Sequence, residues 1–238
     1  PVSYDATNDR DEKVKVLRSL RKVRGGETVT GQYRAGAIGG QAVPGYDDEL
    51  GKPSTTETFV AIKAHIDNWR WQGIPFYLRT GKRLYKSASS VVIQFKEVPH
   101  NMFMHEGANL IQPNRLIISI QPNMSIRLQL QSKIPGLEMN LNTVDMVFDY
   151  TGSAKKESPE AYETLILDAI SGDQTLFMRA DQVEAAWEVV MPILTYWEST
   201  KMRYFPNYPA NSWGPEIADA LIAKDGFHWI NLPDTASE

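Results

Sequence analysis

The sequence predicts an α+β domain in which helices pack on one face of a large, mainly antiparallel sheet. Two observations predict this class. Strand-like alternation fills the middle of the chain, whereas helical spacing dominates after Gly152. The alternating segments are joined by short connections, which is typical of antiparallel neighbours. Because the chain has 238 residues and 42% hydrophobic content, we expect a single domain over residues 1–238.

The first half of the chain predicts one helix, one long loop and then strands. Apolar residues at near-helical spacing predict an amphipathic helix over residues 10–21, which the Gly25-Gly26 pair should end. A glycine-rich loop follows over residues 31–51; we favour a flexible connector over a phosphate cradle, because no lysine or serine is placed as in known cradles. Alternation of period two then predicts strands over residues 58–66, 76–79, 91–95, 116–120, 126–130 and 139–148.

The last third of the sequence is predicted to be helical. Pro159 and Glu160 open a helix that Ser171-Gly172 closes. A longer helix starts near Asp181, whose side chain can cap it. A further short helix is expected after Pro215.

Composition excludes several classes of protein. The formal net charge of -4 carries no basic excess, so we expect no nucleic-acid partner. The absence of cysteine excludes disulfides, thiolate metal sites and a cysteine nucleophile. No apolar run approaches the ~20 residues of a membrane span, and the start is too polar for a signal peptide. We expect a soluble, cytoplasmic protein, and the start at Pro1 is typical of a domain excised from a longer chain.

The common catalytic signatures are missing. The chain has no G-x-G-x-x-G after a strand, no P-loop, no H-E-x-x-H and no G-x-S-x-G. Of four histidines, only His100 and His105 lie close together in sequence, and no further ligands accompany them. We interpret this pair as solvated loop residues and expect no metal site.

Two tryptophans flank Arg70 in the segment DNWRWQG. Stacking on a ligand and packing in the core both suit Trp69 and Trp71. We favour core packing, because the following Gly-Ile-Pro-Phe indicates a turn at a packed sheet end.

Four basic residues follow one predicted strand in YLRTGKRLYKS. Arg79, Lys82, Arg83 and Lys86 stand around a Thr-Gly break, where loops place ligand groups on a rigid scaffold. Lysine supplies a mobile charge for a phosphate, and ammonium or guanidinium groups also donate to sugar hydroxyls. The alternative is a solvated strand edge that charge protects from aggregation.

The run TETFVAIKAHIDNWRWQGIPFYLRTGKRL resembles the hallmark block of bacterial glucose-6-phosphate dehydrogenases. Other segments agree with that family in order and spacing: DEKVKVLRSLR, GQYRAG followed by VPGY, the IQPN turn, PEAYETLILDAISGDQTLFMRADQVEAAW and NSWGP. The resemblance covers nearly the whole chain, but only the second half of the family. It implies a C-terminal substrate-binding and dimerisation domain, without the upstream Rossmann-type domain that binds NADP and without the histidine that acts as catalytic base.

The reaction that the resemblance implies is the first step of the oxidative pentose phosphate pathway. Glucose 6-phosphate is oxidised at C1 to 6-phosphogluconolactone: the base takes the hydroxyl proton while hydride passes to the nicotinamide of NADP. This half would supply substrate contacts only. We therefore expect no catalytic and no cofactor-binding residue in it, and no activity from it alone.

Three substrate contacts are carried over from the family. Lys82 in RTGK resembles the lysine that contacts the sugar phosphate, and Gln121, in the second copy of IQPN, resembles the glutamine at the substrate pocket. A second basic residue is expected five positions after Lys82, where Ser87 stands. Lys86 lies one residue early and takes that role through a small shift of the loop, although a one-residue slip in a strand would turn its side chain to the opposite face.

Vertebrate members also hold a second, structural NADP in this domain, through several arginines and lysines. The corresponding places without a positive charge here are Val92, Ser119, Gln129 and Trp213. Because only Arg79 and Trp229 match, we expect this structural site to be absent.

The resemblance further implies a homodimer that meets through the broad sheet, which fits the partner face that Arg127, Gln129 and Gln131 line in one predicted strand. The alternative is a non-catalytic dimerisation or interaction module, whose partner affinity would not depend on Lys82. A β-rich module for neutral glucans is a third reading, which no family match supports.

Overall fold

A computed structural model of the chain describes residues 1, 3, 5–100, 112–137, 140–150, 161–200 and 204–231. The chain splits into two compact units, Pro1–Tyr85 with Glu160–Glu238, and Lys86–Pro159. That both units belong to the single domain expected from the sequence stays a prediction. No described helix is long and apolar enough to cross a membrane.

The first unit combines helices with short sheets. Its helices are α1 (Ala6–Arg18), α2 (Tyr46–Leu50), α4 (Ala161–Ser171), α5 (Ala180–Ser199) and α6 (Ile217–Ala223), with a 3-10 turn, η1 (Gly25–Glu27). Its strands are β1 (Thr28–Gly31), β2 (Tyr33–Arg34), β3 (Gly36–Ile38), β4 (Gln41–Val43), β5 (Phe59–His65), β6 (Pro75–Gly81) and β11 (Tyr208–Pro209). β1, β5 and β6 form an antiparallel sheet in that order, β3 pairs with β4 in a hairpin, and β11 pairs with β2 in parallel. The glycine-rich loop expected over residues 31–51 thus contains four short elements.

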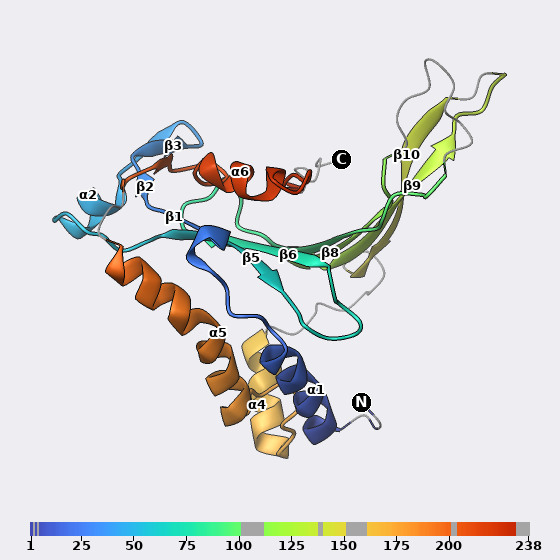
Figure 1. Cartoon of the computed structure of the whole chain (residues 1–238), viewed down its shortest axis with the longest axis horizontal. Helices are drawn as coiled ribbons and strands as arrows, with labels where there is room; N and C mark the ends of the chain where they lie inside the picture. Colours follow the sequence, from blue (N-terminus) through green and yellow to red (C-terminus); the bar gives the residue numbers. More distant parts are fainter. Residues whose placement is uncertain are drawn as a thin grey trace. The chain divides into compact units, whose positions relative to one another are not determined.

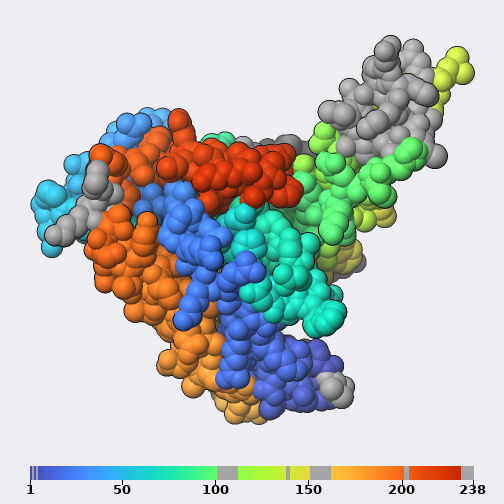
Figure 2. Space-filling model, viewed as in Figure 1, coloured from blue at the N-terminus to red at the C-terminus, as the bar shows by residue number. Residues whose placement is uncertain are grey.

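The central strand β5 buries both of its faces, because alternate side chains point to opposite sides of a sheet. Phe59 and Ala61 belong to one core cluster with Leu221 of α6, while Ala64 belongs to another with Ile193 of α5. Figure 1 shows α6 on one side of this sheet and α1, α4 and α5 on the other. In Figure 2 the red α6 lies over blue and cyan segments of the same unit. The α+β class is confirmed, with the difference that helices cover both faces of this sheet.

Helix α1 begins and ends for identifiable reasons. Asp5 caps it by accepting hydrogen bonds from the Thr7 and Asn8 N–H groups at 3.0 and 2.9 Å. The Ser3 hydroxyl, followed by the Asn8 N–H, holds the pKa of Asp5 far below its usual value. The helix ends at Arg18, before the Gly25-Gly26 pair, because the following segment pairs with the end of β5: the Arg21 N–H donates to the His65 carbonyl at 2.9 Å.

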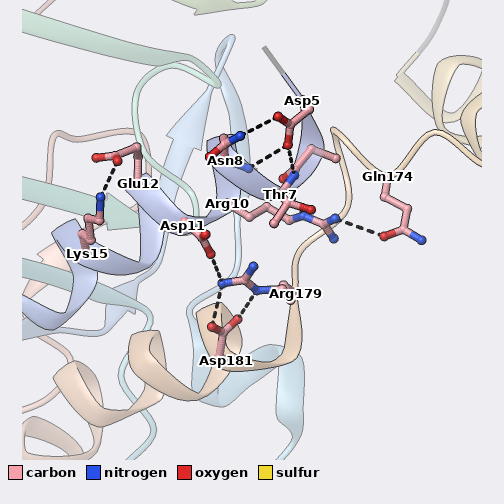
Figure 3. A network of polar contacts seen from close by, with 11 residues as sticks. Asp5, Thr7, Asn8, Arg10, Asp11, Glu12, Lys15, Gln174, Arg179 and Asp181 are labelled. Carbon is pink, nitrogen blue, oxygen red and sulfur yellow. Dashed lines mark hydrogen bonds and ion pairs between the residues drawn. The ribbon is translucent and has the colours of Figure 1, made fainter. Parts of the chain in front are cut away.

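Ion pairs join α1 to the start of α5 (Figure 3). The Arg179 guanidinium contacts Asp11 of α1 and Asp181 of α5, each at 2.6 Å. Beside it, the buried Arg10 donates to the Gln174 side chain at 3.0 Å. Asp181 was expected to cap α5, but Arg179 occupies the cap position and Asp181 lies in the first turn.

The second unit is a four-stranded antiparallel sheet. Its strands are β7 (Ser89–Gln94), β8 (Arg115–Gln121), β9 (Ser125–Lys133) and β10 (Leu141–Asp149), in the order β10-β9-β8-β7. These strands confirm the prediction that the alternating segments of the sequence form strands. The predicted start of the last one at Met139, and the predicted helix opening at Pro159 and Glu160, lie outside the described residues.

The register gives this sheet one apolar face. Leu116, Leu128 and Met146 are directly paired across three strands, as are Ile118, Ile126 and Phe148. Met146 and Phe148 are 63% and 52% exposed. The opposite face is mixed and contains the ion pair of Arg127 with Asp145 at 3.3 Å.

The two tryptophans between β5 and β6 differ. Trp71 packs edge-on against Phe76, with ring centroids 5.4 Å apart, as the core interpretation predicts. Trp69 is 103% exposed, so core packing is wrong for this residue. It lies in the turn that joins the two strands, where strand alternation no longer directs a side chain inward.

Candidate functional site

Lys82 stands immediately after β6, at the place where the strand leaves the sheet. Its backbone N–H donates to the Thr58 carbonyl at 2.8 Å, and its side chain is exposed. Among the described residues, its ammonium group has no hydrogen-bond or ion-pair partner. The residue before Lys82 is Gly81, and a larger residue does not fit there, because a Cβ would lie 2.8 Å from the ring of Phe59. The chain therefore presents a free positive charge from a fixed position.

A cavity of about 390 Å³ opens beside Lys82, between the β5–β6 pair and α5. Side chains of β5 and α5 make its walls mainly apolar, and polar groups of Glu57, Thr58 and Thr80 stand with Lys82 at the strand ends. The apolar wall consists of Phe59, Val60, Ile62, Val190, Ile193, Leu194 and Trp197. A concave site with a few polar groups and an ammonium that has no partner among the described residues suits a small anionic ligand.

The turn after Lys82 is held by an ion pair and by backbone pairing, in which the Arg83 carbonyl accepts from the Asn211 N–H at 2.8 Å. Arg83 has a positive φ of 52°, and its guanidinium contacts Glu49 at 2.6 Å. Glu49 also accepts from the Tyr33 hydroxyl at 2.7 Å, and Tyr33 and then Arg83 lower the pKa of Glu49. Burial, followed by the bond to Glu49, raises the pKa of Tyr33 to about 12. The charge of Arg83 is therefore already paired with Glu49. This residue stabilises the turn and is not available for a ligand.

Arg79 lies on the other face of the same sheet. In the β5–β6 register Arg79 pairs with Ala61, which packs toward α6. The guanidinium carbon of Arg79 lies 4.9 Å from the centroid of the Trp213 ring and 4.7 Å from that of the Trp229 ring. The side-chain oxygen of Asn231 accepts a hydrogen bond from the same guanidinium. Burial lowers the pKa of Arg79. The expectation of one cluster of four basic residues is therefore wrong for Arg79 and Arg83, because alternation and Glu49 direct them elsewhere.

The other two predicted contacts belong to the second unit. Lys86 is half-buried and precedes β7, whereas Gln121 is exposed and ends β8. Ser89, the first residue of β7, pairs with Gln121, so Lys86 and Gln121 lie toward the same end of this sheet. Residues 86–88 are not part of a strand, and the objection that a one-residue slip from Ser87 would turn Lys86 to the opposite face does not apply.

No group of three or more metal-binding side chains is found within the described part of the chain. His100 is exposed in an irregular segment, and His105 lies outside the described residues.

Sequence reasoning missed two residues that surround Lys82, Thr58 and Tyr208. Both are buried and both contact the backbone of Lys82. Tyr208 lies 126 positions from Lys82, and no local pattern marks it as part of this site.

The chain matches the family described as glucose-6-phosphate dehydrogenase, C-terminal domain, over residues 1–230. It is 48% identical over 239 residues to a glucose-6-phosphate 1-dehydrogenase of Zymomonas mobilis, covering 97% of this chain and 49% of that protein. It is also 48% identical over 235 residues to the protein of that name in Mycolicibacterium smegmatis, covering 96% of this chain and 47% of that protein. The chain thus spans about half the length of the curated relatives it matches.

Solved structures give the same result. A structure described as glucose-6-phosphate dehydrogenase in complex with its substrate glucose 6-phosphate has a TM-score of 0.85 at 35% identity, covering 97% of this chain and 47% of that one. The glucose-6-phosphate 1-dehydrogenase of Mycobacterium avium has a TM-score of 0.80 at 32% identity, covering 98% of this chain and 47% of that one.

Proposed function

Because the chain belongs to the glucose-6-phosphate dehydrogenase family through its C-terminal domain, we propose that it is the substrate-binding and dimerising half of such an enzyme. The complete enzyme oxidises glucose 6-phosphate to 6-phosphogluconolactone. The catalytic base and the NADP site belong to the upstream half, where NADP accepts the hydride from C1. One observation carries the proposal: a lysine whose ammonium has no partner in the described part of the chain stands at a fixed turn beside a cavity, within the family's hallmark block.

In this proposal the chain's own residues bind and orient the sugar phosphate. The Lys82 ammonium binds the phosphate, because an unpaired cation gains a charge-assisted hydrogen bond without breaking an existing ion pair. Lys86 and Gln121, which belong to the second unit, stay substrate contacts predicted from the family resemblance. Holding the phosphate fixes C1 relative to the base and the nicotinamide, and such positioning supplies much of the catalytic advantage in bimolecular steps.

The residues present do not fit a structural NADP. Four of the expected basic places are uncharged, and Arg79, which matches, is already enclosed by Trp213, Trp229 and Asn231. A phosphate would have to displace these partners. We therefore propose that NADP binds only to the upstream half, and no step of the reaction involves it in this chain.

The proposed dimer forms through the apolar face of the second unit's sheet, and not through the face of Arg127, Gln129 and Gln131 that the sequence indicated. Exposed apolar side chains gather there on β10, and a second copy of the chain would bury them. Location in the cytoplasm stays a prediction.

The test is NADP-dependent oxidation of glucose 6-phosphate, assayed for the chain alone and with its upstream half restored. We expect turnover only from the restored protein. In it, Lys82→Ala should raise KM for glucose 6-phosphate by about 10- to 100-fold, the range that loss of a charged hydrogen bond gives, with a smaller change in kcat. Lys52→Ala, at an exposed lysine away from the cavity, is the control and should leave KM unchanged.

Two results would contradict the proposal. Turnover by the chain alone would place the base within it, among His65, His100, His105 and His228. An unchanged KM for glucose 6-phosphate in Lys82→Ala, with binding of a partner chain retained, would favour the alternative that this chain is a non-catalytic dimerisation or interaction module.

A further inference from the structure

The hydroxyl of Tyr208 reaches the backbone of Lys82. Tyr208 opens β11, and its side chain is fully buried. The hydroxyl oxygen lies 2.9 Å from the carbonyl oxygen of Lys82 and 3.0 Å from the Thr58 Oγ1. It also lies 3.3 Å from the Thr58 carbonyl oxygen, the longest of the three contacts. Two buried hydroxyls thus surround the turn that carries the free ammonium.

The hydroxyl protons that are available decide which group donates in each of these hydrogen bonds. The Thr58 Oγ1 already accepts from the backbone N–H of Tyr33 at 3.1 Å, so its own proton is available for the Tyr208 oxygen. Tyr208 has a single proton, and the shorter of its two carbonyl contacts is with Lys82. Burial raises the pKa of Tyr208, which keeps the phenol protonated. The chain of hydrogen bonds therefore runs from Tyr33 through Thr58 and Tyr208 to the Lys82 carbonyl.

Thr58 also holds the other side of the Lys82 backbone. Its carbonyl accepts the Lys82 N–H at 2.8 Å, so both backbone groups of Lys82 are fixed by Thr58 and Tyr208. The Tyr208 ring is itself anchored, with its centroid 5.7 Å from that of Phe59 and 6.3 Å from that of Tyr33. A lysine side chain is flexible and has several rotatable bonds. Fixing the backbone from which it starts therefore limits the region that its ammonium can reach.

We propose that Tyr208, acting with Thr58, is a positioning residue for Lys82, which sets the ammonium where the phosphate of the substrate binds. The inference rests on the proposed function, in which Lys82 binds that phosphate. Tyr208 lies beneath the turn and does not touch the substrate. Without its hydroxyl, the partly buried Lys82 carbonyl would lose this donor, and the turn would shift to find another one.

The experiment measures steady-state kinetics of Tyr208→Phe in the full-length enzyme. Removing this single hydroxyl should raise KM for glucose 6-phosphate by about three- to tenfold, as expected for one lost buried hydrogen bond, with kcat changed by less than about twofold. Tyr77→Phe is the matched control, since its hydroxyl bonds to Asp225 and, among the described residues, to no atom of Lys82 or Thr58, and it should leave KM unchanged.

A double mutant separates positioning from general loss of structure. In the Lys82→Ala background, Tyr208→Phe should have no further effect on KM, because the group it positions is gone. Additive effects would overturn the inference. If Lys82→Ala raises KM and Tyr208→Phe does not, only this inference fails; if Lys82→Ala itself leaves KM unchanged, the proposed function fails.

If Tyr208→Phe does not fold, a pair of variants at Thr58 tests whether these hydroxyls position Lys82. Thr58→Val removes the hydroxyl that donates to Tyr208, while Thr58→Ser keeps it. We expect Val at this position to raise KM and Ser to restore most of the affinity. Equal KM values for the two variants would overturn the inference.

Discussion

Strand β6 shows how one short segment assigns different roles to its basic residues. Arg79 lies within β6 and faces the α6 side of the sheet, whereas Lys82 lies beyond Gly81, the last residue of the strand, and lines the cavity. Arg79 meets two tryptophan rings, where cation–π contacts stabilise a guanidinium that burial has partly desolvated. The Lys82 ammonium has no partner within the residues that the structure describes. A basic run in the sequence could not distinguish these outcomes.

The ring stack around Arg79 makes a prediction about nucleotide binding by the 238-residue chain. Trp213→Leu should lower the melting temperature by about 2–4 °C, the effect of roughly 1 kcal/mol in a protein of this size. Added NADP should not change the melting temperature of the unmodified chain, because the Arg79 guanidinium is enclosed by Trp213, Trp229 and Asn231. Thermal unfolding with and without NADP measures both effects.

The control for this stack is Trp69→Leu, because Trp69 is fully exposed and its loss should change little. A clear rise in melting temperature with NADP would show a nucleotide site in this chain and contradict the proposed absence.

Among the elements, α1 and α5 are joined by the ion pairs of Arg179. Arg179→Met should lower the melting temperature at neutral pH by about 1–3 °C, since largely exposed ion pairs contribute little individually. Lys15→Met, which breaks an exposed pair with Glu12 within α1 alone, should lower it less. An effect of Arg179→Met no larger than that of Lys15→Met would show that the pairs between helices add nothing.

The same pairs predict a dependence on pH. The hydrogen bond from Arg179 lowers the pKa of Asp181 from its ordinary value of 3.8 in the folded protein. A group whose folded pKa is depressed stabilises the fold above its unfolded pKa, and this stability is lost as the pH falls through the folded pKa. The difference in melting temperature between the unmodified chain and Arg179→Met should therefore narrow as the pH falls below 3.8. A difference that stays constant down to acid pH would exclude the carboxylates as its source.

Elements were predictable where their signal is local. Alternation of apolar residues predicted β5 to β10, since side-chain period follows directly from the geometry of the strand. The end of α1 was not predictable, because it depends on pairing between Arg21 and His65, far along the chain. The cap of α5 was misassigned for a similar reason: Asp181 is engaged by Arg179, which also reaches Asp11 of α1.

For the whole molecule, the apolar sheet face of the second unit predicts self-association. Met146→Lys would place a charge in the proposed interface, where burying it without a partner is costly, and should convert a dimer to a monomer. Thr143→Lys lies on the opposite face of the same strand and should leave the dimer intact. Analytical ultracentrifugation distinguishes the two states; a dimer that survives Met146→Lys would place the interface elsewhere.

The sequence by itself determined the α+β class, the positions of most strands and helices and, through its hallmark block, the family. These depend on short-range periodicity and on sequence runs that resemble the family, both of which can be read from the sequence alone. Only the tertiary structure decided that helices cover both faces of the β1-β5-β6 sheet and that Arg79 and Arg83 are already engaged. It also revealed that Tyr208 and Thr58 hold the Lys82 backbone. Each of these depends on contacts between residues far apart in the chain, which local patterns do not encode.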